Sequence, residues 1–286
     1  MIKRLIGGSK RVLGVHRPGR ELIILPDDTF LVSYPKSGNT WTRVLIANLL
    51  SPEKPADFRS INRLVPDPSS ETKRHFTNMP RPRVIKNHFV FDPRYPRVMY
   101  IVRDPRDVVI SEYHYQRKTR NIDDRYPLEE YVRRFIAGET YPENGSWGEH
   151  VTGWLSARNG DARFLLLRYE HLLSDTVEEL ARIASFLNIS ASPERLAEIV
   201  TLSSADHMRK LEAQQGDASS LMKGSRKDVA FIRFAKSGAW RSDLPESLVE
   251  SIESAWGPVM HHLGYELQFP QHARTSELTD IALRRR

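Results

Sequence analysis

The sequence of 286 residues contains no cysteine. It therefore has no disulfide framework, no thiol nucleophile and no thiolate metal site. No apolar run approaches the roughly 18 residues that a membrane-spanning helix needs. The first residues, MIKRLIGGSKRVLG, contain no continuous apolar stretch and do not resemble a secretory signal. Together these absences favour a cytoplasmic enzyme with no transmembrane segment.

Positive charge is scarce outside the two ends of the chain. The formal net charge is +7, from 43 Lys and Arg against 36 Asp and Glu. Residues 1–20 hold six of the basic residues and no acid, and the chain ends in three arginines. The remaining 34 basic residues face 36 acidic ones, which leaves residues 21–283 at −2. An anionic ligand of the core must therefore be held by a few placed residues. Solvated tails are the simpler interpretation of the ends, and contact of the tails with nucleic acid or a membrane surface is the alternative.

Short apolar segments that alternate with helical patterns predict the fold class. Buried strands are expected at 29–34, 83–88, 97–102 and 164–167. Helices are expected at 41–50, 105–116, 127–137, 146–157, 176–187, 193–201, 204–212 and 245–256, with irregular chain at 51–82 and 213–230. This order is typical of an α/β protein with a parallel sheet flanked by helices on both faces, which binds ligands beyond the carboxyl ends of its strands. We expect a single domain over 21–270, between a basic N-terminal tail (1–20) and a C-terminal tail (271–286).

The junction between the first strand and the first helix reads YPKSGNTW over residues 34–41. Gly38 lets the main chain approach a ligand closely. The amides of Gly38, Asn39 and Thr40 stand at a helix start, where the helix dipole favours an anion. Ser37, Asn39 and Thr40 add side-chain donors. The Walker pattern is absent because Lys36 precedes the glycine instead of following it.

Two further groups of polar residues lie at the ends of predicted strands. The segment VIKNH (84–88) places Lys86 and His88 on one side of a strand, an arrangement that suits a reaction needing a base and a cation. The segment RDPRDVVIS (103–111) places Arg103 at a strand end and Ser111 about two turns into the next helix, with Asp104 as its N-cap. A guanidinium and a hydroxyl so placed can hold one phosphate.

These three motifs, in this order, resemble those of the sulfotransferases that use 3′-phosphoadenosine 5′-phosphosulfate (PAPS). YPKSGNTW is similar to their 5′-phosphosulfate loop, usually YPKSGTTW, with Asn39 in place of the commoner Thr. VIKNH is similar to their strand ending in KTH, and residues 103–111 resemble their 3′-phosphate motif. The resemblance covers roughly residues 28–260 and implies a P-loop-like scaffold. It also implies His88 as catalytic base, Lys36 as the cation at the leaving phosphate and Lys86 as a stabiliser of the sulfuryl oxygens.

Weaker matches extend the resemblance. Tyr169 and Ser203 fall in segments that lie near adenine in the family, and Arg233 falls in the family's closing element, where it pairs with the 3′-phosphate. The stretch WGEHVTGW (147–154) also resembles the family, and its helical spacing favours a structural role. The resemblance thus implies a donor site built from Lys36, Ser37, Gly38, Asn39, Thr40, Trp41, Arg103, Ser111, Tyr169, Ser203 and Arg233.

The implied reaction is in-line transfer of a sulfuryl group from PAPS to a hydroxyl or amine of an acceptor, with 3′-phosphoadenosine 5′-phosphate (PAP) as product and no metal. A small phenol or alcohol is the favoured acceptor, and a carbohydrate or lipid hydroxyl is possible. A small-molecule kinase on the same scaffold is the alternative, but it needs a Walker lysine after Gly38 and a carboxylate for Mg²⁺. A nucleic-acid-binding protein would not explain three ordered motifs, so no nucleic-acid partner is expected. The oligomeric state is left open.

Overall fold

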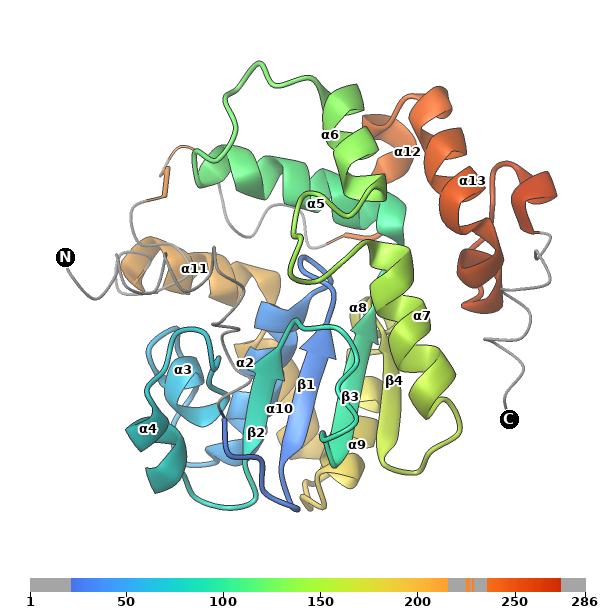
Figure 1. Ribbon diagram of the computed structural model, residues 1–286. Coiled ribbons are helices and arrows are strands. Elements are labelled where there is room, and N and C mark those ends of the chain that lie inside the picture. Colours follow the sequence, from blue (N-terminus) through green and yellow to red (C-terminus); the bar gives the residue numbers. More distant parts are fainter. Residues whose placement is uncertain (1–21, 216–224, 227, 229–235, 274–286) are drawn as a thin grey trace.

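A parallel sheet forms the centre of the protein. The computed structural model describes residues 22–215, 225, 226, 228 and 236–273. Within them, strands pair in the order β2-β1-β3-β4, with the bounds β1 Thr29–Ser33, β2 Val84–Asn87, β3 Arg97–Val102 and β4 Phe164–Arg168 (Figure 1). The register places Leu31 of the central strand β1 between Lys86 of β2 and Met99 of β3. The four predicted strands are confirmed, each to within one residue at either end.

Helices cover both faces of the sheet because alternate strand residues point to opposite sides. Phe30 and Val32 pack on one face with apolar side chains of α5 (Pro105–Lys118), α6 (Leu128–Ile136), α7 (Trp147–Arg158) and α13 (Glu246–His262). Leu31 and Met99 pack on the other face with α2 (Asn39–Leu50), α3 (Ser60–Leu64), α9 (Thr176–Phe186) and α10 (Pro193–Leu202). The predicted single-domain α/β fold is confirmed.

Shorter helices occupy segments that we expected to be irregular. Both α3 and α4 (Lys73–Asn78) lie within 51–82. At the start of α3, Asp57 accepts hydrogen bonds from the amides of Arg59 and Ser60, and Thr72 caps α4 by accepting from the amide of His75. These hydrogen bonds join residues two or three positions apart, and the proline-rich composition of 51–82 gives no indication of them. The prediction of irregular chain there is therefore wrong in part.

A helix also occupies part of the loop that we expected in the second half of the chain. The helix α11 (Ala205–Gln215) runs into the predicted loop at 213–230, most of which lies outside the described residues, as do residues 1–21 and 274–286. The remaining short helices are α8 (Tyr169–Ser174), α12 (Trp240–Asp243) and the 3₁₀ turn η2 (Pro270–Ala273). None of the helices in the described segments combines the length and the hydropathy of a membrane span.

The carboxyl ends of the strands all lie at one edge of the sheet, which faces α5 in Figure 1. The segments that follow the strands therefore meet at this edge. Each of the three main sequence motifs is one of these segments, so the fold brings them to the same place.

Candidate active site

The loop between β1 and α2 leads into a helix start that has no side-chain cap. Lys36 and Gly38 both have positive φ, at 66° and 94°. Gly38 is the N-cap residue of α2, and the first turn contains no acidic residue. A Cβ on Gly38 would lie 2.4 Å from Cδ2 of Tyr169, so the tyrosine ring packs directly on this glycine. The amides of this turn and the positive end of the helix dipole form a site that favours an anion.

Arg103 at the end of β3 faces the same loop. Its Nη1 donates to the carbonyl of Lys36 at 3.1 Å, and its guanidinium carbon lies 4.3 Å from the centroid of the Tyr169 ring. Trp41 meets that ring edge-on at 6.2 Å between centroids, and its Nε1 donates to the carbonyl of Ser203 at 2.8 Å. The structure therefore brings five predicted donor-site residues together from separate segments of the chain.

The other predicted donor-site residues vary in their surroundings. The hydroxyl of Ser37 is buried and has no hydrogen-bond partner among the described residues. Thr40 and Ser111 are half-buried on α2 and α5. The Ser203 hydroxyl is buried and accepts a hydrogen bond from α2, so the protein itself holds it. Arg233 lies outside the described residues.

His88 follows β2, and β1 fixes its ring. Nδ1 lies 2.8 Å from the carbonyl oxygen of Ser33 and 3.3 Å from the Ser33 hydroxyl. A carbonyl can only accept, so Nδ1 carries the proton and Nε2 is the basic nitrogen. Burial lowers the pKa of His88 well below its usual value, and the positive charge of Lys86 lowers it further. The ring is therefore neutral at pH 7, and Nε2 can take a proton from a hydroxyl.

Asn39 connects the loop to this histidine. Its Nδ2 donates to the Ser33 hydroxyl at 3.2 Å and contacts the carbonyl of Leu31 at 3.5 Å. The side chain that departs from the commoner sequence of the loop therefore points toward β1, at the residue that holds His88. Asn39 thus joins the start of α2 to the predicted base.

The two predicted catalytic lysines have different partners. The ammonium of Lys36 lies 4.0 Å from the ring centroid of Tyr115 on α5, a cation–π contact. The ammonium of Lys86 forms an ion pair with Oδ2 of Asp67, in the segment between α3 and α4. Burial lowers the pKa of Lys86, and the carboxylate of Asp67 opposes that shift.

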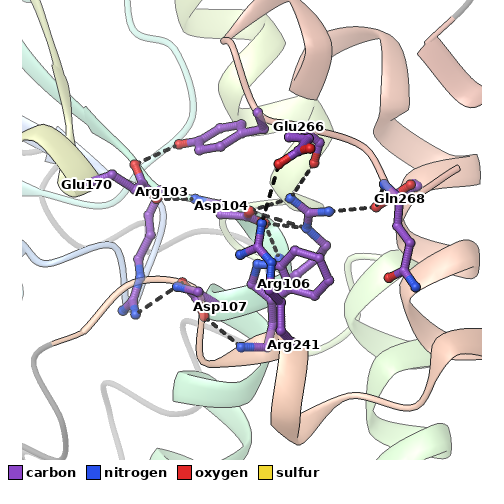
Figure 2. A network of polar contacts seen from close by, with 12 residues as sticks. Arg103, Asp104, Arg106, Asp107, Glu170, Arg241, Glu266 and Gln268 are labelled. Atoms are coloured by element: carbon purple, nitrogen blue, oxygen red, sulfur yellow. Dashed lines mark hydrogen bonds and ion pairs between the residues drawn. The ribbon is translucent and has the colours of Figure 1, made fainter. Parts of the chain in front are cut away.

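Asp107 anchors a distant segment beside Arg103 (Figure 2). Its carboxylate accepts hydrogen bonds from the amides of Gly238 at 2.7 Å and Trp240 at 3.1 Å. Arg103 lies 4.0 Å from the same carboxylate and donates to the carbonyl of Lys236 at 3.2 Å. Nε of Arg103 is buried without a partner among the described residues. The segment 236–240 is therefore fixed next to the guanidinium that the sequence assigns to the 3′-phosphate.

Three side chains of α7 form hydrogen bonds with main-chain carbonyls just after β2 and β3. Nε1 of Trp147 donates to the carbonyl of Arg103 at 3.2 Å, and Nε1 of Trp154 donates to the carbonyl of Phe89 at 3.2 Å. Nε2 of His150 lies 3.0 Å from the carbonyl of His88. Burial lowers the pKa of His150 to about 4, so this ring is also neutral. The structural role predicted for WGEHVTGW is thus a specific one: its ring N–H groups hold carbonyls of the candidate site.

Sequence reasoning missed Asp67, Asp107 and His150 as parts of the site. Asp107 and His150 lie inside two of the segments that resemble the family, 103–111 and 147–154, so their position in these segments indicates that they lie near the site. Asp67 stands in a segment that reads VPDPSS, which predicts only a turn. Among the described residues, no group of three or more His, Asp or Glu side chains is arranged to hold a metal ion.

Comparison with known proteins identifies the family of this chain. A family model described as the sulfotransferase domain matches residues 26–264. Sulfotransferase 2B1 of Mus musculus is 30% identical over 248 residues, which cover 82% of this chain and 72% of that protein. The 3-beta-hydroxysteroid sulfotransferase of Cavia porcellus is 28% identical over 263 residues, which cover 88% of this chain and 89% of that protein.

The fold is also similar to that of a solved structure, retinol dehydratase in a complex with retinol and PAP. The TM-score is 0.69 at 21% identity, over 87% of this chain and 85% of the other. The chain belongs to the sulfotransferase domain family. The predicted enzyme class, a PAPS-dependent sulfotransferase, is confirmed, and the kinase alternative is set aside.

Proposed function

We propose that the protein transfers the sulfuryl group of PAPS to a hydroxyl or amine of a small-molecule acceptor, with His88 as general base. One observation carries this proposal. An uncapped helix start, the guanidinium of Arg103 and a neutral histidine with a basic Nε2 meet at the same edge of the sheet. These are an anion site, a phosphate ligand and a proton acceptor.

The residues present fit PAPS as the sulfuryl donor. When bound, PAPS supplies the sulfuryl group and a phosphate leaving group. The amides of Gly38, Asn39 and Thr40 would hold its 5′ end, because this helix start lacks both a cap and an acid. Arg103 would hold the 3′-phosphate, and its buried Nε, which has no partner among the described residues, supports that role. Ser111 and Arg233 are proposed to share this phosphate.

The remaining residues would move a proton and offset charge. His88 takes the acceptor's proton at Nε2 as the acceptor atom bonds to sulfur and the bond from sulfur to the bridging phosphate oxygen breaks. Lys36 offsets the charge that grows on the departing phosphate, and Lys86 offsets charge on the sulfuryl oxygens. PAP leaves with the electron pair of the broken bond. The proton and charges balance without a metal ion.

The acceptor class is inferred from the relatives. One relative is a 3-beta-hydroxysteroid sulfotransferase, and the compared structure contains retinol. Both names point to an alcohol of a small apolar molecule. We therefore favour an alcohol of a small apolar molecule, lipid alcohols included, over a phenol or a carbohydrate. The cytoplasmic location, the absence of a nucleic-acid partner and the domain bounds of 21–270 stay predictions.

The His88→Asn variant tests the proposal. Asn keeps polarity and approximate size but cannot take the proton. General-base catalysis contributes about 10²–10⁴-fold, so single-turnover sulfuryl transfer should slow by that order. Affinity for PAP, measured by calorimetry, should stay within a few-fold, because the groups proposed to hold the donor do not include an imidazole. Lys36→Ala should lose both rate and some affinity.

His261→Asn is the matched control, since this histidine is exposed in the last turn of α13. It should leave rate and affinity unchanged. If His88→Asn turns over normally, another group is the base. If His88→Asn loses PAP binding together with rate, His88 supports the site, and the proposed division between binding and proton transfer is wrong.

A further inference from the structure

Asp67 is held at the carboxyl end of β2 by three separate contacts. Its Oδ2 pairs with the ammonium of Lys86. Its Oδ1 accepts from the amide of Ser69 at 2.8 Å and from the hydroxyl of Ser69 at 2.7 Å. The amide of Lys86 donates to the carbonyl of Pro66 at 2.9 Å, so this segment lies along the edge strand of the sheet. Both carboxylate oxygens are therefore fixed, and the main chain around them is fixed as well.

The ion pair is removed from water. The side chain of Lys86 is 10% exposed and that of Asp67 is 16% exposed. A pair this buried costs desolvation energy, and replacing such pairs by apolar side chains is often neutral or stabilising. Stability is thus a weak reason for the pair, whereas its location beside a candidate base suggests a role in the reaction.

We propose that Asp67 is a positioning residue for sulfuryl transfer: it holds the Lys86 ammonium next to His88 and offsets its charge there. This inference rests on the proposed roles of Lys86 and His88. An ammonium has three N–H donors, and Asp67 orients it by accepting one of them. Nothing in the sequence motifs assigns a role to Asp67.

The charges around His88 explain why an anion is needed. Lys86 on β2 is the cation whose charge acts on His88, Asp67 is the anion, and His150 on α7 is a neutral ring. Lys86 in turn faces the buried guanidinium of Arg43 on α2. When His88 takes a proton, an imidazolium forms two residues from Lys86. Among the described groups that act on His88, Asp67 is the one anion, so without it the imidazolium would face the Lys86 ammonium alone.

Asp67→Asn tests the inference because it preserves shape and an oxygen for Ser69 but removes the charge. Burial and Arg43 already lower the pKa of Lys86, and Asp67 opposes them. Loss of the anion should lower that pKa further, by about 1 unit or more. The alkaline limb of the pH profile for single-turnover transfer should move to lower pH by the same amount. A merely structural role would lower the rate equally at every pH.

Asp161→Asn is the matched control. Asp161 also accepts a hydrogen bond from an amide two residues on and pairs with arginines, but it precedes β4, at the opposite end of the strands. Its pH profile should match that of the wild type. An Asp67→Asn profile with both limbs unmoved would overturn the inference.

A second measurement needs no activity. NMR titration of His88 in Lys86→Gln, where Asp67 faces the histidine without its partner, should give a higher pKa than in the double variant Lys86→Gln/Asp67→Asn. Equal values would overturn the inference even if Asp67→Asn alone fails to fold. If the values differ but His88→Asn turns over normally, the base assignment fails, and the electrostatic link between Asp67 and His88 stands.

Discussion

The two helix starts that meet at the site are built in opposite ways. At the junction of β1 and α2, glycine is the N-cap, no side chain caps the helix and the first turn carries no acid. At the junction of β3 and α5, Asp104 caps the helix by accepting from the amide of Arg106, and Pro105 stands at the first helical position. The same order of strand, loop and helix therefore gives two different helix starts. That of α2 has no acidic residue in its first turn, and that of α5 is capped by a carboxylate.

The polar groups around the second junction are engaged by distant parts of the chain. Arg106 pairs with Asp104 and with Glu253 of α13, both at 2.6 Å, and its guanidinium carbon lies 3.7 Å from the ring centroid of Trp240. It also donates to the carbonyl of Glu266 at 3.0 Å. Figure 2 shows these contacts converging from α5 and from the C-terminal segment. This junction links α5 to the C-terminal segment. Within it, the buried Nε of Arg103 has no partner among the described residues.

The contrast between the two helix starts indicates how ligand binding is divided between the two ends of the proposed donor site. A helix end closed by Asp104 cannot use its amides and dipole for an anion, so the phosphate role there falls to the Arg103 side chain. The α2 end has no such cap, so main-chain amides can serve. Changes at the second junction should mainly affect stability, and changes at the first should mainly affect ligand affinity.

The largest expected effect is that of Arg106→Met. The variant leaves the carboxylates of Asp104 and Glu253 buried without their guanidinium. Breaking a buried ion pair in this way costs about 3–5 kcal/mol. Urea denaturation should therefore show a free energy of unfolding lower by that amount.

Arg133→Met is the control for this prediction. Arg133 pairs with Glu130 on the exposed side of α6, where such pairs contribute little. Its unfolding midpoint should match that of the wild type. A small effect of Arg106→Met would mean that the second junction is not the stabilising one, and the comparison would fail.

The sequence predicted both junctions because their signals are local. Strand, loop and helix directly follow one another along the chain, and Asp104 and Gly38 act on residues close to them. The four strands were predicted to within a residue for the same reason: buried strands are short apolar runs bounded by turn residues. The motif residues are then brought together by a general property of parallel sheets.

Contacts between distant segments were not predictable. Arg106 and Glu253 are 147 residues apart, and the His150 ring meets the carbonyl of His88 from 62 residues away. Asp67 pairs with Lys86, which is 19 residues further along the chain. Asp67 stands in a predicted turn, and no local pattern indicates which residue its carboxylate will contact. Each of these pairs depends on how helices or connecting segments lie on the sheet, so only the folded structure reveals it.

Gly38→Ala should have the next largest effect, this time on affinity. Gly38 has a φ of 94°, and an added Cβ would lie 2.4 Å from the Tyr169 ring. A left-handed conformation costs a residue with a Cβ roughly 1–2 kcal/mol of stability. The added Cβ also forces the Tyr169 ring, which stacks on Arg103, to move, and this displacement disturbs the proposed ligand site. We expect PAP affinity, measured by calorimetry, to fall roughly 30-fold, which is ~2 kcal/mol.

Gly160→Ala separates backbone strain from the clash. Gly160 has a φ of 81°, but no atom lies within 4 Å of an added Cβ. This variant should lose some stability and bind PAP as the wild type does. If both glycine variants lowered PAP affinity equally, packing of Tyr169 on the loop would not explain the requirement for Gly38.

Thr40→Val gives the smallest effect and the sharpest test of the comparison. Thr40 is a half-buried residue in the first turn of α2, and valine replaces its hydroxyl by a methyl of similar size. If this hydroxyl serves the donor's 5′ end, its loss removes a hydrogen bond to a charged group, which is worth about 1.5 kcal/mol. PAP affinity should fall about tenfold while the free energy of unfolding without ligand stays within about 0.5 kcal/mol of the wild type.

Thr176→Val is the matched control and should do the reverse. The Thr176 hydroxyl is also half-buried in the first turn of a helix, but it donates to the carbonyl of Leu172 at 2.7 Å. That variant should lose about 1 kcal/mol of stability and keep its PAP affinity. If Thr40→Val destabilised the protein as much as Thr176→Val and left PAP binding unchanged, the α2 junction would be an ordinary helix start, and the contrast between the two junctions would have no functional meaning.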